Sequence, residues 1–105
     1  MSVDAELQIH EVRGAGATEV TVVVRCLRGP VRLGARFSLV RDTRAPIDLT
    51  VTGIVRYGRP DHAIDPVHSG LVTLRGTGGH ELRPVVGEAG REVMPVIQGD
   101  NPAAP

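Results

Sequence analysis

The segment that most constrains the fold is Glu19 to Leu27, EVTVVVRCL, because its apolar side chains recur with a period of two. One face of the segment carries the side chains of Val20, Val22, Val24 and Cys26. Successive side chains of an extended chain point to opposite sides, so this alternation is typical of a β-strand. Val23 and Leu27 lie on the other face, and apolar residues on both faces predict a strand that is central or covered on both sides.

Four further stretches show the same period, namely residues 6–13, 37–41, 49–57 and 71–75. In the first, Leu7 and Ile9 alternate and the phase slips at Val12, which indicates a bulge. In the third, Gly53 predicts a bend or a close approach of another backbone. Residues 58–67 contain two prolines and are expected to form a loop or a broken edge strand.

Composition supports a sheet-based core. Sixteen of the 105 residues are valine, whereas the aromatic side chains are only Phe37 and Tyr57. No window of the chain has helical periodicity, and short strands separated by glycine and proline turns predict an antiparallel barrel or sandwich. We expect an all-β fold, a small antiparallel β-barrel of about six strands. One domain is expected over residues 5–97, followed by a flexible C-terminal tail over residues 98–105, which has little apolar surface to offset the entropy of ordering.

The sequence signal is weakest over residues 80–97. HELRPVV fits a last strand that is broken at Pro84, and REVMPVI fits another short extended piece. In the strand over residues 37–41, Phe37 and Leu39 are expected on one face and Ser38 and Val40 on the other, because their order along the chain alternates.

Residues 29–40, GPVRLGARFSLV, contain two glycines five positions apart, a spacing that phosphate-binding loops also have. Such a loop needs a lysine to reach the phosphates. All twelve basic residues of this chain are arginines, so no nucleotide is expected. We interpret Gly29-Pro30 and Gly34 as corners at which a strand leaves the barrel wall and re-enters it.

The order of these segments resembles the second domain of translational GTPases, the β-barrel of the elongation factor Tu domain 2 type. The resemblance covers residues 6–76 and rests on four matches: Arg28-Gly29, Val31 to Gly34, Leu49 to Tyr57 and Leu74-Arg75-Gly76. In that family a long strand ends in an Arg-Gly turn, a short arm runs into a glycine, and a closing strand ends in Leu-Arg-Gly. The chain departs from the family at two turns, since Ala35 replaces a frequent acidic residue and Val67 stands where the glycine would fall.

The resemblance implies a non-catalytic barrel, here expected as a stand-alone domain because the GTP-binding domain is absent. In relatives this barrel contacts ribosomal RNA, the aminoacyl end of transfer RNA or a neighbouring domain.

The charges are distributed unevenly, although the formal net charge is zero. Residues 25–59 contain eight arginines and two acidic residues, whereas residues 1–24 and 60–105 each carry an excess of three negative charges. This predicts a basic patch formed by Arg28, Arg32, Arg36, Arg56 and Arg59. The alternative is that acidic side chains of the flanking segments fold over these arginines and pair with them.

Residues 61–69, DHAIDPVHS, form the stretch that is richest in reactive side chains. Its histidines and carboxylates match no zinc-binding spacing, and Ser69 beside His68 lacks the surroundings of a nucleophile elbow. Cys26 shares a face with three valines and is expected to be buried and unreactive. We therefore expect a polar loop, no enzyme activity, no metal and no cofactor.

Two functions remain open from the sequence. The primary prediction is a protein-interaction or assembly module that binds an unidentified protein or a second copy, because valine is abundant and Val93 to Ile97 has no evident strand to pair with. The alternative is an RNA- or ribosome-binding module, which the arginine-rich segment and the resemblance favour. Without a leader or a long apolar run, the chain is expected to be cytoplasmic with no membrane partner.

Overall fold

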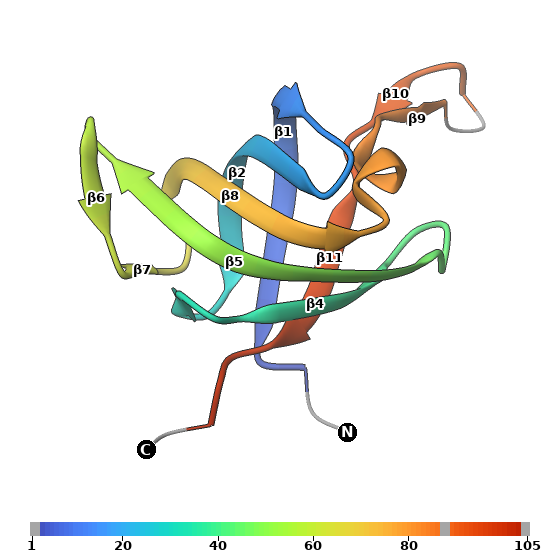
Figure 1. The fold of residues 1–105 in the computed structure, drawn as a ribbon. Helices are drawn as coiled ribbons and strands as arrows, with labels where there is room; N and C mark the ends of the chain where they lie inside the picture. Colours follow the sequence, from blue (N-terminus) through green and yellow to red (C-terminus); the bar gives the residue numbers. More distant parts are fainter. Residues whose placement is uncertain (1–2, 87–88, 104–105) are drawn as a thin grey trace.

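The structure, a computed structural model, describes residues 3–86 and 89–103. Six antiparallel strands close into a barrel: β1 (Ala5–Ala15), β2 (Glu19–Arg28), β4 (Arg36–Val40), β5 (Pro46–Arg56), β8 (Ser69–Thr77) and β11 (Val96–Asp100). Their order around the barrel is β4-β11-β1-β2-β8-β5, and β5 returns to pair with β4 (Figure 1). The predicted all-β fold and the antiparallel barrel of six strands are confirmed.

Shorter pieces lie outside the barrel wall or close its ends. β3 (Val31–Arg32) pairs with β7 (Ala63–Ile64), β6 (Arg59–Asp61) forms a hairpin with β5, and β9 (Val85–Val86) pairs with β10 (Glu92–Val93). The 3₁₀-helix η1 (Gly79–Leu82) follows β8 and packs against β1 and β5. The two short strands β6 and β7 agree with the broken edge expected over residues 58–67.

The core fills the barrel with aliphatic side chains and one phenylalanine. Its largest fully buried side chains are those of Phe37, Leu7, Ile9, Leu49, Ile64, Leu74, Leu82 and Ile97. The apolar face of β2, from Val20 to Cys26, is buried as predicted. Its other face is not covered, since Val23 is half-buried and Leu27 is 39% exposed. β2 is therefore central, between β1 and β8, but covered on one face only.

β-bulges account for the breaks in the sequence pattern. The pairing of β1 with β2 shifts register just before Val12, where the phase slip predicts a bulge. The pairing of β5 with β8 shifts between Val51 and Gly53, so that Ile54 is buried and Val55 is only half-buried. An extra residue in one strand of a pair moves the following side chains to the opposite face. Gly53 thus marks the irregularity that the sequence predicts.

A third bulge corrects the faces predicted for β4. The pairing of β4 with β5 shifts register between Phe37 and Leu39, and Val40 is fully buried while Leu39 is half-buried. The prediction that Phe37 and Leu39 share the inner face is wrong, because the shift interrupts the alternation.

The C-terminal segment also differs from the prediction. Residues 98–100 belong to β11, which pairs with β1 and β4, so the tail expected over residues 98–105 begins too early. Val96 and Ile97, expected to lack a pairing strand, lie opposite Gln8 and Leu7 of β1. The expected strand over HELRPVV is replaced by η1 and the two-residue β9. Of the predicted tail, residues 104–105 lie outside the described residues.

Periodicity missed β11 for a physical reason. The strand has only five residues, and its Gly99 lies so close to β4 that a Cβ atom there would collide with the carbonyl group of Arg36. Glycine at such a position removes a side chain from the pattern and permits the close approach of two backbones.

Candidate functional site

The corner after β2 brings the arginine-rich segment back to the barrel. Gly29 is crowded, because a Cβ atom there would lie 2.6 Å from the backbone nitrogen of Val31 and 3.0 Å from Sγ of Cys26. After β3, Gly34 adopts a φ of 88° and donates its backbone N–H to the carbonyl of Val51. The chain thus leaves the wall at Gly29 and rejoins it beside β5, as the two-corner interpretation expects.

The five arginines of the predicted patch occupy different parts of this region. Arg28 ends β2, Arg32 lies in β3, Arg36 begins β4, and Arg56 and Arg59 face each other across the β5–β6 hairpin. Arg36 lies opposite Thr50 of β5, six residues before Arg56, which corresponds to roughly 20 Å along an extended strand. The structure therefore pairs Arg56 with Arg59 across the hairpin and places Arg36, on the neighbouring strand β4, far from both.

Acidic side chains lie close to Arg36 and Arg28. Arg36 forms a two-pronged ion pair with Asp48, with N–O distances of 2.8 and 2.9 Å. The hydrogen bond from Arg36 lowers the pKa of Asp48. Glu6, from the N-terminal acidic segment, lies 4.0 Å from Nε of Arg28. Asp48 belongs to the arginine-rich segment itself, so of these two acids only Glu6 comes from a flanking segment, as the alternative interpretation predicts.

Arg56 is held in a network at the end of β5. Its side chain is only 13% exposed. One terminal nitrogen, Nη2, lies 2.7 Å from Nδ1 of His68, and Nη1 lies 3.7 Å from a carboxylate oxygen of Asp61. Its guanidinium carbon lies 5.6 Å from the centre of the Tyr57 ring, within range of a cation–π contact. These contacts hold the Arg56 side chain next to the hairpin turn.

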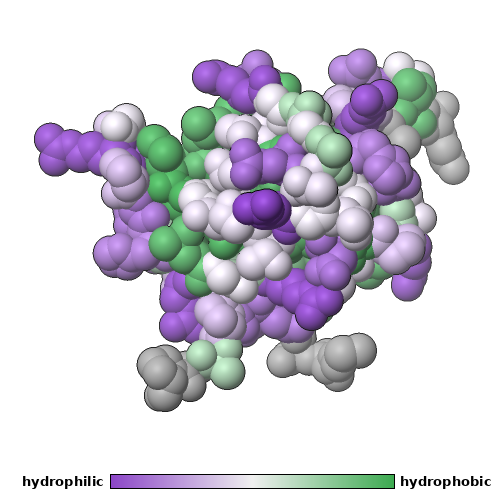
Figure 2. All heavy atoms as spheres, viewed as in Figure 1, coloured by the Kyte–Doolittle hydropathy of each residue, from purple (hydrophilic) through white to green (hydrophobic). Residues whose placement is uncertain are grey.

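We call residues 56–59, the turn between β5 and β6, the hairpin tip. Tyr57 and Gly58 have φ values of 52° and 74°, so both central residues of this turn are left-handed. Turns of this type prefer Asn-Gly or Gly-Gly, and tyrosine is an unusual choice. Tyr57 is also 89% exposed. Figure 2 shows strongly hydrophilic side chains projecting from the molecule at this end.

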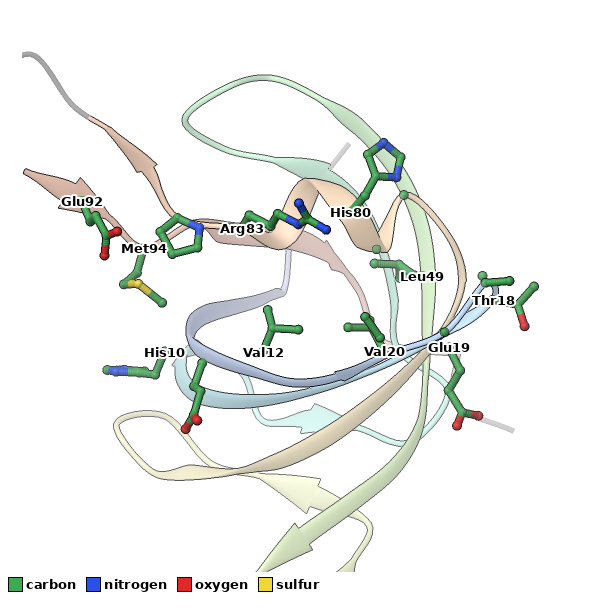
Figure 3. Close-up of a pocket in the computed structure, with 18 residues that line it drawn as sticks. His10, Val12, Thr18, Glu19, Val20, Leu49, His80, Arg83, Glu92 and Met94 are labelled. Atoms are coloured by element: carbon green, nitrogen blue, oxygen red, sulfur yellow. The ribbon is translucent and has the colours of Figure 1, made fainter.

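A pocket of about 650 Å³ opens between the β1–β2 turn and the segment that runs from η1 to β10 (Figure 3). Apolar side chains from four places in the chain line it: Val12, Val20, Leu49 and Met94. Val12 and Val20 project from the β1–β2 hairpin, and Arg83 lies across the pocket from them, next to η1 (Figure 3). We call this hollow the end pocket. Its size lies within the range of binding pockets in proteins.

The end pocket is richer in carboxylates than in guanidinium groups. Among the described residues, its lining includes three glutamates, Glu11, Glu19 and Glu92, and one arginine, Arg83. Glu11 pairs with Arg13 at 3.3 Å, whereas no ion pair joins Glu19 or Glu92 to another described residue. Apart from Leu49, the lining comes from residues 10–20 and 76–94, which lie in the two acidic segments of the sequence. The two acidic segments of the sequence thus meet at one end of the barrel.

Backbone hydrogen bonds attach the loop over residues 61–69 to Cys26 of β2. Val67 donates its N–H to the carbonyl of Cys26 at 2.8 Å, and Cys26 donates to the carbonyl of His68 at 2.8 Å. A hydrogen bond from the backbone of His62 lowers the pKa of Asp61. The described residues contain no group of three or more histidine, cysteine or acidic side chains that could hold a metal ion.

Cys26 is fully buried, as predicted, and burial raises the pKa of its thiol. A buried thiol with a raised pKa is a poor nucleophile at neutral pH.

Sequence reasoning missed the end pocket and the role of the hairpin tip. The pocket joins residues that are far apart in the chain, and no local pattern marks it. The tip had a signal, because Tyr57-Gly58 follows an alternating strand at the position of a two-residue turn.

Comparison of the chain with protein-family models, with curated proteins and with solved structures found no match. In the part of the chain that the structure describes, no helix has the length and apolar character needed to cross a membrane.

Proposed function

We propose that this barrel is a non-catalytic interaction module that binds a protein segment in its end pocket. The observation that carries the proposal is the composition of the pocket, which has apolar lining side chains and more carboxylates than guanidinium groups. An apolar anchor in a pocket supplies affinity, and charges at the rim supply orientation and selectivity. This combination suits a partner with an exposed apolar or aromatic side chain beside a basic one.

Within Val93 to Ile97, the segment expected to be unpaired, Val96 pairs with β1, Ile97 pairs with β1 and β4, and Val93 pairs with β9. A partner can instead contact side chains of the end pocket, where Met94 is half-buried and Glu92 is exposed.

We also propose that the barrel is of the elongation factor Tu domain 2 type. Val67, which stands where that family has a glycine, has a φ of 64°. A β-branched residue rarely adopts this left-handed conformation, whereas glycine adopts it readily. The backbone at this turn therefore has the form that a glycine would favour, which supports the resemblance.

The pocket proposal is tested with a matched pair of variants. Met94→Glu places a charge in the end pocket, and Ser38→Glu places the same charge on the exposed surface of β4. Proteins cross-linked to each variant in native lysate are compared with those cross-linked to the wild type, and self-association is followed by light scattering. We expect Met94→Glu alone to lose the wild-type association. Equal association for all three proteins would contradict the proposal.

RNA or ribosome binding is a second candidate, favoured by the hairpin tip. Tyr57 exposes an aromatic ring beside Arg59, and single-stranded nucleic acid is bound by rings that stack on bases together with cations that contact phosphates. Binding of this kind weakens steeply with salt. A gel-shift titration with single-stranded and structured RNA at low salt tests it, and an absence of any shift would exclude it.

A further inference from the structure

The hairpin tip and the end pocket have complementary chemistry. The tip presents an exposed aromatic ring, Tyr57, with Arg59 beside it. The end pocket presents apolar side chains together with carboxylates, among them Glu92, which forms no ion pair with another described residue. We infer that the end pocket of one copy binds the hairpin tip of a second copy, which joins the molecules head to tail. This inference rests on the proposed function, since it names the partner of the same pocket.

The tip is held ready for such a contact. Arg56 contacts His68 and Asp61, and its guanidinium carbon lies 5.6 Å from the centre of the Tyr57 ring. A side chain that is ordered before binding loses less entropy when it is bound. Tyrosine is well suited to this role, because its ring buries a large apolar area and its hydroxyl group can still form a hydrogen bond.

The pocket offers apolar surface and a carboxylate to the tip. Val12, Val20 and Met94 provide apolar surface for the ring of Tyr57. Glu92 provides a carboxylate that has no ion-pair partner among the described residues. Arg59 of the incoming tip is exposed and has no ion-pair partner in the same part of the chain. The tip therefore offers an exposed cation, and the pocket lining, although it includes Arg83, has more carboxylates than guanidinium groups.

The placement of the two surfaces excludes a contact within one molecule. The β5–β6 hairpin and the η1–β10 segment lie on opposite sides of the barrel (Figure 1). A contact between two different surfaces is heterologous, so its repetition produces a ring or an open filament. A neutral molecule with a basic segment and an acidic end has the charge distribution that such stacking requires.

The turn conformation supplies a variant that separates binding from folding. Tyr57 adopts a φ of 52° before Gly58, a position that asparagine occupies more readily than tyrosine. Tyr57→Asn should therefore keep or improve the stability of the hairpin while it removes the ring. If tyrosine is retained at this position for binding, the variant will be well folded and poorly associating.

The experiment is analytical ultracentrifugation of the wild type, Tyr57→Asn and Glu92→Arg over a range of protein concentrations and at two salt concentrations. We expect the wild type to associate with rising concentration and less so at high salt. Each variant should weaken association by about ten-fold or more. A mixture of the two variants should form dimers and nothing larger, because Tyr57→Asn keeps an intact pocket and Glu92→Arg keeps an intact tip.

A charge exchange provides the internal control. Arg59→Glu alone should weaken association, and Arg59→Glu together with Glu92→Arg should restore a substantial part of it. A wild type that stays monomeric at every concentration, or variants that associate like the wild type, would overturn the inference. Loss of single-stranded RNA binding in Tyr57→Asn, with self-association unchanged, would also overturn it and assign the tip to RNA.

Different results would contradict the binding of a protein segment in the end pocket and the head-to-tail contact between copies. If the wild type is monomeric but Met94→Glu loses a cross-linked protein that Ser38→Glu keeps, the pocket binds a different protein and only the head-to-tail contact is wrong. If Met94→Glu changes neither cross-linking nor self-association, the pocket has no such role and both proposals are wrong.

Discussion

Asn101 joins the C-terminal segment to β3, because the backbone N–H of Arg32 donates a hydrogen bond to the side-chain oxygen of Asn101 at 2.8 Å. Its side-chain nitrogen donates to the carbonyl of Pro30 at 2.8 Å, and its backbone nitrogen donates to Asp4 at 2.7 Å. One asparagine thus joins the two ends of the chain to β3.

Replacement of Asn101 by alanine should therefore destabilise the barrel. Two side-chain hydrogen bonds are lost at a partly exposed site, and we expect a cost of about 1–2 kcal/mol in the free energy of unfolding. Urea denaturation measures this cost. Ser38→Ala, at an exposed position on β4, is the control and should leave the unfolding midpoint unchanged. Equal unfolding midpoints for the two variants would show that the hydrogen bonds of Asn101 to β3 do not stabilise the barrel.

Gly99→Ala should destabilise the barrel more than Gly16→Ala does. A Cβ atom at Gly99 would collide with the carbonyl group of Arg36, whereas at Gly16 it would meet the carbonyl oxygen of Glu19 at 3.5 Å. The collision forces β4 and β11 apart, and we expect a loss of roughly 2 kcal/mol or more. Thermal denaturation of both variants is the measurement. A small effect at Gly99 would mean that β11 does not pack against β4 as described.

The Arg36–Asp48 pair should make stability depend on pH. Because the hydrogen bond from Arg36 lowers the pKa of Asp48, the folded state binds a proton less readily than the unfolded chain does. The contribution is therefore present at neutral pH and is lost as the pH falls below the ordinary range of a carboxylate. We expect Asp48→Asn to lower the melting temperature slightly at neutral pH, and this difference should shrink as the pH falls below the ordinary range of a carboxylate pKa. Both groups are exposed, so added salt should also reduce the difference.

Cys26 should react only when the barrel opens. Its side chain is fully buried, and burial raises the pKa of its thiol. Alkylation in native buffer should be at least about 100-fold slower than that of a small free thiol, and denaturant should abolish the difference. Mass spectrometry of iodoacetamide-treated protein gives both rates. Rapid alkylation of the native protein would contradict the burial of β2.

The long strands could be predicted from the sequence because their alternation is strong. The valines of β2 and the bend at Gly53 each leave a local mark. β11 could not be found in this way, because its five residues include a glycine that is explained only by a neighbouring backbone. The inner face of β4 was missed for a similar reason, since a bulge leaves no trace in its five residues.

The candidate site was less accessible to sequence reasoning. The arginines were identifiable by type, but their partners were not: Asp48 and Glu6 reach Arg36 and Arg28 from other strands. The end pocket unites the two acidic segments, and only the closure of the barrel brings them together. The sequence showed that charge is separated along the chain, whereas the structure shows where each part of it lies.

The most direct test of the account is a dilution series of isotopically labelled protein followed by two-dimensional ¹H–¹⁵N NMR. If the end pocket binds the hairpin tip of another copy, the amide signals of Val12, Val20 and Met94 should shift together with those of Tyr57 and Gly58 as concentration rises. The rest of the barrel should stay unchanged. Spectra that do not change with concentration, or shifts confined to other surfaces, would contradict the account.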